Sequence, residues 1–406
     1  MRILHTSDWH LGQHFMGKTR QAEHQAFCAW MIEQVRAHGV DALLIAGDIF
    51  DTGAPPSYAR EQYNRFIVEL RATGCELVVL GGNHDSVAML SESQSLLAEL
   101  GTRVIPGVCS ELSEQLLVLH QRDGQPGALL CGIPFIRPRD VLHSQAGQSA
   151  QDKQLSLQQA IAEHYQQLYA LAEAKRVELG GQLPIIATGH LTTVGASASD
   201  SVREIYVGSL EAFPTSAFPP AAYIALGHIH RPQKVGGLEH IRYSGSPLAL
   251  SFDEARQQKE VLLVELDAGG LRQITPLPVP CFQPLLSLRG SLAELAESIK
   301  QAASQGTAET PVWLEVLVTS DDYLTDLQVR IEALCQGLPV EVLRVRRERG
   351  SASAGLTASA GETLDELSVS EVFSRRLQQE QLAPAEVTQL EGLYGAVLEQ
   401  LRSPDS

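Results

Sequence analysis

The chain has 406 residues, which is too many for one hydrophobic core and predicts two or three domains. Its 31 Lys and Arg residues against 48 Asp and Glu residues give a net charge of −17, which excludes a protein that holds nucleic acid by overall charge alone. No apolar run approaches the ~20 residues of a membrane-spanning helix, and residues 1–8 turn polar too early for a signal peptide. We therefore expect a cytoplasmic protein without a membrane anchor.

The first two thirds of the chain repeat a pattern of a short apolar run, a polar turn and a helical stretch. The runs after the first are almost continuously apolar, which is typical of strands covered on both faces. We therefore predict an α/β fold with a layered, largely buried sheet. The predicted strands lie near residues 3–4, 42–46, 77–80, 184–187 and 223–226, and the longer helices near residues 21–38, 59–72 and 144–179.

A proline-rich segment at residues 276–280 predicts the end of this first domain, because proline interrupts helices and central strands. A small α+β domain is predicted next, followed by a Gly- and Ser-rich linker and a tail of two amphipathic helices. The small domain is predicted to contain strands at 285–288, 312–319 and 340–346 and helices at 291–304 and 323–335. The resulting domain boundaries are 1–278, 282–348, 349–362 (linker) and 363–402 (tail).

Metal-capable side chains follow each predicted strand of the large domain. Since functional groups in open α/β sheets gather outside the carboxyl ends of the strands, we expect these side chains to converge. Each motif alone is weak, because a Gly-His or Gly-Asn-His-Asp turn is often structural; five in order are much more specific. The candidate metal ligands are Asp8, His10, Asp48, Asn83, His190, His228 and His230, whereas His5 lies within a strand and is expected in the core.

This order of motifs resembles the calcineurin-like metallophosphoesterase superfamily. The resemblance implies a β-sandwich flanked by helices and two divalent metal ions bridged by Asp48, one with Asp8, His10 and His230 and the other with the remaining candidates. Carboxylate, imidazole and amide ligands without thiolate favour Mn²⁺, with Mg²⁺ as an alternative. The family chemistry is attack of a metal-activated water on a phosphoester, with His84 beside the leaving oxygen and Asp85 orienting it. The role of Asp51 stays open.

A second motif, from Gly12 to Thr19, matches the phosphate-binding pattern G-x-x-x-x-G-K-[ST]. A phosphate-cradling loop leaves its strand directly, but here residues 8–10 intervene and bulky residues occupy positions 14–16. We therefore predict that this chain binds no nucleotide.

Longer stretches resemble the SbcD family, the nuclease subunits of bacterial SbcCD complexes. They include MRILHTSDWHLGQ, LIAGDIFDTGAPPSYAR, VVLGGNHDS, IPFIRPRD, IIATGHLTTVGA, YIALGHIHRPQ, RYSGSPLALSFDE and ELSVSEVFSRRL. The resemblance implies ATP-dependent exonuclease activity on double-stranded DNA and endonuclease activity on single strands and hairpins, in DNA repair, recombination and replication. It also implies that the SbcC ATPase partner hydrolyses the ATP, that the second domain caps DNA, and that the tail docks on SbcC.

Three further sets of residues are expected to make contacts outside the metal site. The candidate DNA contacts are Arg137, Arg139, Arg203, Arg231, Lys234 and Arg242, together with Arg344, Arg346, Arg347 and Arg349 after the small domain. The candidate contacts with SbcC are Leu364, Leu367, Val372, Phe373 and Leu377. The family implies a homodimer within a heterotetramer, for which the candidate residues are Tyr63, Phe66, Leu96 and Leu97.

Two other functions stay open at this point. One is a phosphodiesterase or nucleotidase of the same fold that acts on small substrates. The other is a structural scaffold for the partner, in which the metal site of this chain would be vestigial. The complete set of candidate ligands argues against a scaffold.

Overall fold

Two six-stranded sheets form the larger part of the protein, in the computed structural model that describes residues 1–142, 150–202, 205, 212–319, 326–347 and seven residues between 373 and 394. The first sheet has the order β14 (Gly270–Pro278), β13 (Glu260–Asp267), β1 (Arg2–Thr6), β4 (Ala42–Ile45), β5 (Glu76–Leu80) and β6 (Thr102–Ile105). The second has the order β11 (Gln233–Val235), β12 (Leu238–Tyr243), β10 (Tyr223–Gly227), β9 (Ile185–His190), β8 (Pro126–Cys131) and β7 (Leu116–His120).

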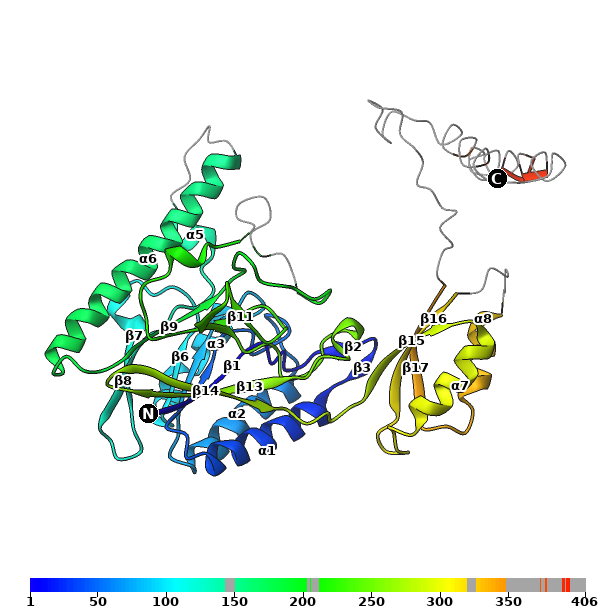
Figure 1. Cartoon of the computed structure of the whole chain (residues 1–406), viewed down its shortest axis with the longest axis horizontal. Coiled ribbons are helices and arrows are strands. Elements are labelled where there is room, and N and C mark those ends of the chain that lie inside the picture. The colour runs from blue at the N-terminus through cyan, green and yellow to red at the C-terminus, as the bar shows by residue number, and fades with distance from the viewer. Residues whose placement is uncertain are drawn as a thin grey trace.

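The two sheets pack face to face and carry helices on their outer faces (Figure 1). On β4, Leu44 belongs to the core between the sheets, whereas Leu43 and Ile45 pack under the helices. Both faces of the strand are therefore buried, which explains its continuous apolar run. The first sheet is covered by α1 (Gln21–Ala37), α2 (Ser57–Arg71), α3 (Val87–Glu92) and α4 (Gln94–Glu99), and the second by α6 (Ala150–Glu178) with the short α5 (Pro138–Val141). The predicted sandwich flanked by helices is confirmed.

A smaller three-stranded parallel sheet follows the sandwich and has its own hydrophobic core. It contains β15 (Leu285–Gly290), α7 (Leu292–Ala303), β16 (Val312–Val318), α8 (Leu327–Cys335) and β17 (Val340–Arg347), in the predicted order. The helix α7 begins at a capping box in which Ser291 and Glu294 satisfy each other's backbone N–H groups. Prolines 276 and 278 do not end the preceding strand as expected, because β14 lies at the edge of its sheet, where proline is tolerated.

A hairpin of β2 (His14–Phe15) and β3 (Lys18–Thr19) joins the sandwich to the small sheet. The Phe15 ring stacks on Trp313 of β16 at 5.8 Å between centroids, and Lys18 forms an ion pair with Glu341 of β17. This hairpin is the segment that matches the phosphate-binding pattern. Its backbone is engaged in strand pairing and its lysine in a contact between domains, so it does not have the form of a phosphate-cradling loop.

The remaining described elements are short. Three 3₁₀ helices span η1 (Leu112–Gln115), η2 (Thr215–Ala217) and η3 (Phe252–Glu254) within the described ranges. None of the helices described here is long and apolar enough to span a bilayer. The predicted linker lies outside the described residues, as does most of the tail; the described part of the tail includes Phe373, whose ring stacks on Tyr394 at 3.9 Å, and Leu377, which is buried.

His5, on β1, is a core residue as expected: it is fully buried, and its Nδ1 shares a hydrogen bond of 2.8 Å with the Tyr223 hydroxyl across the two sheets. Burial lowers the pKa of His5 from 6.5 to about 3. Between these two values the unfolded chain binds a proton at His5 that the folded chain does not bind. The contribution of neutral His5 to stability is therefore present above pH 6.5 and is lost as the pH falls toward 3.

We predict that His5→Gln makes the free energy of unfolding of the metal-free protein less dependent on pH. Between pH 6 and pH 4, the slope should fall by about 1.4 kcal/mol per pH unit, which is the value for one linked proton. Chemical denaturation at a series of pH values, with a chelator present, measures this slope. His14→Gln, at an exposed position, is the control; an unchanged slope in His5→Gln would show that His5 is not buried in its neutral form.

Candidate metal centre

The carboxyl ends of strands from both sheets meet at one end of the sandwich. Strands β1, β4 and β5 run parallel in the first sheet, and β9 and β10 run parallel in the second. The residues after these strand ends are joined by backbone hydrogen bonds from Asp8 N to the Gly47 carbonyl (3.0 Å) and from His10 N to the Asp48 carbonyl (3.1 Å). The predicted convergence of the strand ends is therefore observed.

Glycine allows the turns after the strands to approach each other closely at this end, both between the two sheets and within the first one. A Cβ atom on Gly227, at the end of β10, would lie 1.9 Å from the carbonyl oxygen of Ala46. A Cβ atom on Gly82 would lie 2.1 Å from Oδ1 of Asp48 and 2.3 Å from its backbone nitrogen. Because such distances are shorter than any contact between non-bonded atoms, only glycine fits these two positions.

The backbone at the site is held in an unusual conformation. Asp8, His10, Asp48 and His228 all have positive φ angles, between 48° and 94°. Among the described residues, Met16 is the only other non-glycine residue with a positive φ. This conformation costs free energy for residues with a Cβ, and such strain gathers where a function requires a fixed side-chain direction.

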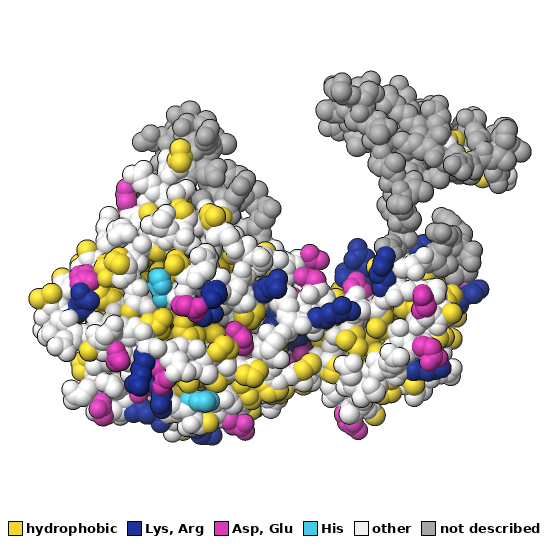
Figure 2. Space-filling model, in the orientation of Figure 1, with side chains coloured by type: hydrophobic (Ala, Val, Ile, Leu, Met, Phe, Trp, Pro, Cys, Tyr) yellow, Lys and Arg dark blue, Asp and Glu magenta, His cyan; other side chains and the backbone are white. Residues whose placement is uncertain are grey.

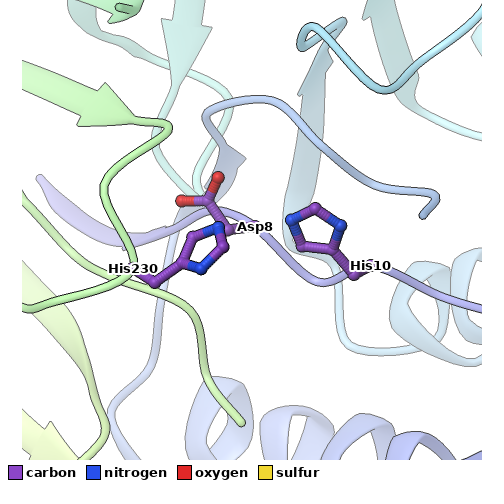
Figure 3. A group of neighbouring side chains, drawn as sticks. All are labelled: Asp8, His10 and His230. Atoms are coloured by element: carbon purple, nitrogen blue, oxygen red, sulfur yellow. The ribbon is translucent and has the colours of Figure 1, made fainter. Parts of the chain in front are cut away.

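A first group of candidate ligands consists of Asp8, His10 and His230, whose ligand atoms all lie within 4.8 Å of one another (Figure 3). All three side chains are buried. The two carboxylate oxygens of Asp8 accept hydrogen bonds from the backbone nitrogen of His228, at 3.0 and 3.1 Å, and Oδ2 also accepts one from Ser7 at 2.6 Å. The turn after β1 is thereby attached to the turn after β10, which belongs to the other sheet.

A second group consists of Asp48, His190 and His228, again with ligand atoms within 4.8 Å of one another. Asn83 belongs to it by contact: its Oδ1 lies 2.9 Å from His190 Nε2 and 3.0 Å from His228 Nδ1. His190 is oriented by its other ring nitrogen, Nδ1, which lies 2.9 Å from the Ala46 carbonyl oxygen. The structure therefore brings all seven predicted ligand side chains together in two adjoining groups.

Asp48 stands between the two groups. Its Oδ2 lies 3.8 Å from His10 Nε2 and 3.2 Å from His190 Nε2. Burial alone would raise the pKa of Asp48, but the nearby His190 and His10 hold it well below its usual range. In turn, burial lowers the pKa of His190, but the carboxylates of Asp48 and Asp8 outweigh this effect and raise it to about 9. Such concentrated and mutually dependent charge is typical of functional sites.

Two imidazole nitrogens in the site are buried without a hydrogen-bond partner in the described part of the chain: Nε2 of His10 and Nε2 of His228. Buried polar atoms are normally satisfied, so an unsatisfied pair beside two carboxylates indicates that another group completes the site. Imidazole, carboxylate and amide donors are ligands that divalent cations accept. The residues thus fit a centre of two divalent ions.

The structure corrects the expected role of Asp85. Its carboxylate accepts hydrogen bonds from the backbone nitrogens of Gly82 (2.8 Å), Phe50 (3.0 Å) and Ile49 (3.2 Å), so it ties together the two turns that carry Asn83 and Asp48. The hydrogen bond that orients the His84 ring joins its Nδ1 to the Asp51 carbonyl oxygen, at 2.7 Å. The family resemblance implied the orienting role for Asp85, whereas the His84 ring is hydrogen-bonded to a backbone carbonyl 33 residues away.

Asp51, whose role the sequence left open, also contacts a candidate ligand. Its Oδ1 lies 3.2 Å from His10 Nδ1, and His10, Asp51 and His84 form a third group with ligand atoms within 4.8 Å of one another. The carboxylate can hold the Nδ1 proton of His10, which leaves Nε2 directed at the centre. The position of Asp51, three residues after Asp48, was the only signal in the sequence for this contact.

The candidate DNA contacts differ in their surroundings. Arg137 lies beside the site: it donates to the Asp85 carbonyl at 3.1 Å and covers the Phe135 ring at 5.4 Å. Arg139 and Arg231 are exposed. Lys234 and Arg242 both form ion pairs with Glu239, which offsets part of their charge. Arg203 and Arg349 lie outside the described residues.

The candidate dimer residues are mostly in the core of the chain itself. Tyr63, Phe66 and Leu97 are 5%, 1% and 4% exposed and pack between the helices and the first sheet. Leu96 is 65% exposed. The helical spacing selected the inward-facing side chains, so three of the four predicted dimer contacts are corrected to core residues. Of the candidate contacts with SbcC, Leu364, Leu367 and Val372 lie outside the described residues.

Comparison with known proteins places the chain in a class of proteins that agrees with the geometry of the site. Residues 1–232 match the calcineurin-like phosphoesterase family, and residues 281–381 match a family described as the type 5 capsule protein repressor C-terminal domain. The fold and the site therefore define a phosphoester hydrolase of a class that uses divalent metal ions.

Full-length relatives narrow this class. The SbcD subunit of the nuclease SbcCD from Escherichia coli K12 is 53% identical, over 99% of this chain and 98% of that protein. Its counterpart in Rhodobacter capsulatus is 34% identical over 89% of this chain and 88% of that protein, and the one in Bacillus subtilis is 30% identical over 82% and 79%. The chain belongs to the SbcD family, and the resemblance seen in its sequence is confirmed.

We predict that Gly82→Ala weakens Mn²⁺ binding by at least about tenfold, because the added Cβ displaces the Asp48 carboxylate, and a displaced ligand costs metal affinity. Calorimetric titration of the metal-free chain measures the affinity. Gly269→Ala, in the β13–β14 turn, is the control, since its Cβ meets only the flexible Asp267 carboxylate at 3.1 Å. Equal affinities in both variants would mean that Asp48 is not a ligand.

Proposed function

We propose that this chain is a metal-dependent DNA nuclease subunit that cleaves phosphodiesters in double-stranded and hairpin DNA. The observation that carries the proposal is the position of the Asp48 carboxylate between His10 and His190, which belong to different sheets. The relatives are named as nucleases, which supports a nucleic acid as the substrate. The proposed setting is the cytoplasm, in DNA repair, recombination and replication.

The proposed ligands form two sets that share Asp48. Asp8, His10 and His230 complete one set, and Asn83, His190 and His228 complete the other; the burial and proximity of each group support this division. Mn²⁺ is the proposed ion, with Mg²⁺ as the alternative, because the donors are nitrogen and oxygen without thiolate. Two such ions, when bound, would supply Lewis-acid activation of water and of the phosphate.

His84 is the proposed proton donor to the leaving oxygen. Its Nδ1 hydrogen is held by the Asp51 carbonyl oxygen, so Nε2 is the atom left to give a proton to the substrate. The ring lies 4.7 Å from the His10 ring, between centroids, which keeps it beside the proposed ions. Asp85 has a positioning role, through the two turns that it connects.

DNA is proposed to bind across the sandwich and the small domain. Figure 2 shows Lys and Arg side chains on the small domain where it faces the sandwich. A hollow of about 650 Å³ lies between the two parts, and its lining includes Arg256, Arg289, Arg344 and Arg346. Because the whole chain is acidic, we expect contacts with phosphates that weaken steeply with salt and carry little sequence preference.

Residues 282–348 are the proposed DNA-capping domain, and residues 363–402 the proposed docking tail for the SbcC ATPase, connected by the linker at 349–362. SbcC would bind and hydrolyse the ATP that makes the exonuclease ATP-dependent. The relatives are named as one subunit of a nuclease called SbcCD, and this name supports such a partner. Two copies of this chain would pair through helices α2 to α4, giving a homodimer within a heterotetramer.

Cleavage of a hairpin duplex tests the proposed activity. With Mn²⁺, and with SbcC and ATP, we expect the wild-type chain to open the hairpin and Asp48→Ala to lose at least about a hundredfold in rate, because the shared carboxylate is removed. Circular dichroism and SbcC binding should be unchanged in the variant. Hydrolysis of nucleotides but not DNA would overturn the proposal in favour of a small-substrate phosphodiesterase.

Sedimentation tests the proposed dimer. We expect the wild-type chain to sediment as a dimer at micromolar concentration and Leu96→Glu to sediment as a monomer, because a charge at an apolar contact must be desolvated. Leu155→Glu, at a position 59% exposed on α6, is the control and should remain a dimer. A wild-type chain that is monomeric at this concentration would overturn the dimer.

A further inference from the structure

Glu254 is a buried carboxylate at the edge of the metal centre for which the sequence suggested no role. It lies in η3, its side chain is fully buried, and its Oε1 is 3.2 Å from Nδ1 of His230. The opposite ring nitrogen of His230 belongs to the group formed with Asp8 and His10. Glu254 therefore stands behind a proposed ligand, on the side away from the proposed ion.

Five donors surround this one carboxylate. Oε1 accepts from Ser199 at 2.7 Å, from Ser201 and from His230, whereas Oε2 accepts from Lys259 Nζ at 2.6 Å and from the Leu250 backbone nitrogen at 3.0 Å. A buried carboxylate is retained when it is paired and fully hydrogen-bonded. This arrangement favours the ionised carboxylate in one fixed orientation.

The hydrogen-bond directions determine which nitrogen of His230 carries the proton. The Ser201 hydroxyl gives its hydrogen to Glu254, so its oxygen can only accept at the 2.6 Å contact with His230 Nδ1. Nδ1 must therefore carry a hydrogen, and the neutral ring has its free electron pair on Nε2. A histidine that binds a metal ion through Nε2 needs this tautomer, and a carboxylate that holds the Nδ1 proton fixes it.

Lys259 fixes the backbone of the same residue. Its ammonium group is buried and donates to Glu254, to Ser246 at 3.0 Å and to the carbonyl oxygen of His230 at 3.0 Å. Both the ring and the main chain of His230 are thus held by one ion pair. Lys259 also neutralises Glu254, so the carboxylate can act on the histidine without leaving an unpaired buried charge.

We propose that Glu254, with Lys259 as its counter-ion and Ser201 as a bridge, is a positioning residue that sets the tautomer and direction of His230 for metal binding. The inference rests on the proposed metal centre and extends it to a residue 24 positions further along the chain. Both side chains are buried, and their proposed role is to raise the affinity of the chain for the ion that His230 would hold.

Calorimetric titration of the metal-free full-length chain with Mn²⁺ tests this role. We expect Glu254→Gln to weaken one of two binding events by about 10- to 100-fold, the range for lost partners of metal-binding histidines, and to leave the other event unchanged. The weakened event should be the one that His230→Gln removes. Asp253→Asn, at the exposed neighbouring position, is the matched control and should bind like the wild type.

A double variant that removes both charges distinguishes the effect of Glu254 on metal binding from its effect on stability. Lys259→Met should lower the melting temperature, because it leaves the Glu254 charge buried and unpaired, and the double variant Glu254→Gln/Lys259→Met should recover much of that loss. We expect the double variant to bind one Mn²⁺ ion as weakly as Glu254→Gln does. Recovery of wild-type Mn²⁺ affinity together with stability would overturn the positioning role.

The outcomes also distinguish this inference from the proposed centre. If the wild-type chain binds two Mn²⁺ ions and the folded Glu254→Gln and double variants bind both with wild-type affinity, the positioning role is overturned and the centre stands. If the wild-type chain binds no Mn²⁺, the centre and the positioning role are overturned together.

Discussion

The close approach of two sheets at their carboxyl ends is the constraint on which the rest of this structure depends. His190 reaches across from the second sheet to the Ala46 carbonyl of the first, and the backbone of His228 is held by the Asp8 carboxylate. Neither sheet carries the complete set of candidate ligands by itself. The site exists only because the apolar faces of β4 and β9 pack together and bring the turns after them into contact.

The close approach of the sheets buries charged and polar groups, which costs free energy unless other groups pair with them. Several carboxylates and imidazoles are buried within a few ångströms of one another, and four of the residues that carry them, in three turns, have strained backbones. Their mutual hydrogen bonds satisfy part of this polarity, and the proposed divalent cations would satisfy more of it by binding the nitrogen atoms of His10 and His228 that the described part of the chain leaves without partners. Backbone strain thus gathers at the candidate metal centre, beside two imidazole nitrogens without partners in the described residues.

The convergence of the candidate ligands could be predicted from the sequence because each lies at or shortly after the end of a buried strand, where a polar residue that follows an apolar run is distinctive. Contacts that depend on the three-dimensional arrangement of the chain were not predictable. Glu254 reaches His230 through a short 3₁₀ helix, and the Asp51 carbonyl, not the adjacent Asp85, orients His84. The burial of Tyr63 and Leu97 could not be predicted for a related reason: helical periodicity identifies an apolar face but does not say what covers it.

The hairpin of β2 and β3 connects the small domain to the turn that carries the candidate ligands Asp8 and His10. Only four residues separate His10 from Phe15, and the Phe15 ring is stacked on Trp313 in the middle strand of the small sheet. A swing of the small sheet must therefore either break this stack or pull on the turn that carries His10. Movement of the small domain is therefore coupled to the position of His10, the second candidate ligand along the chain.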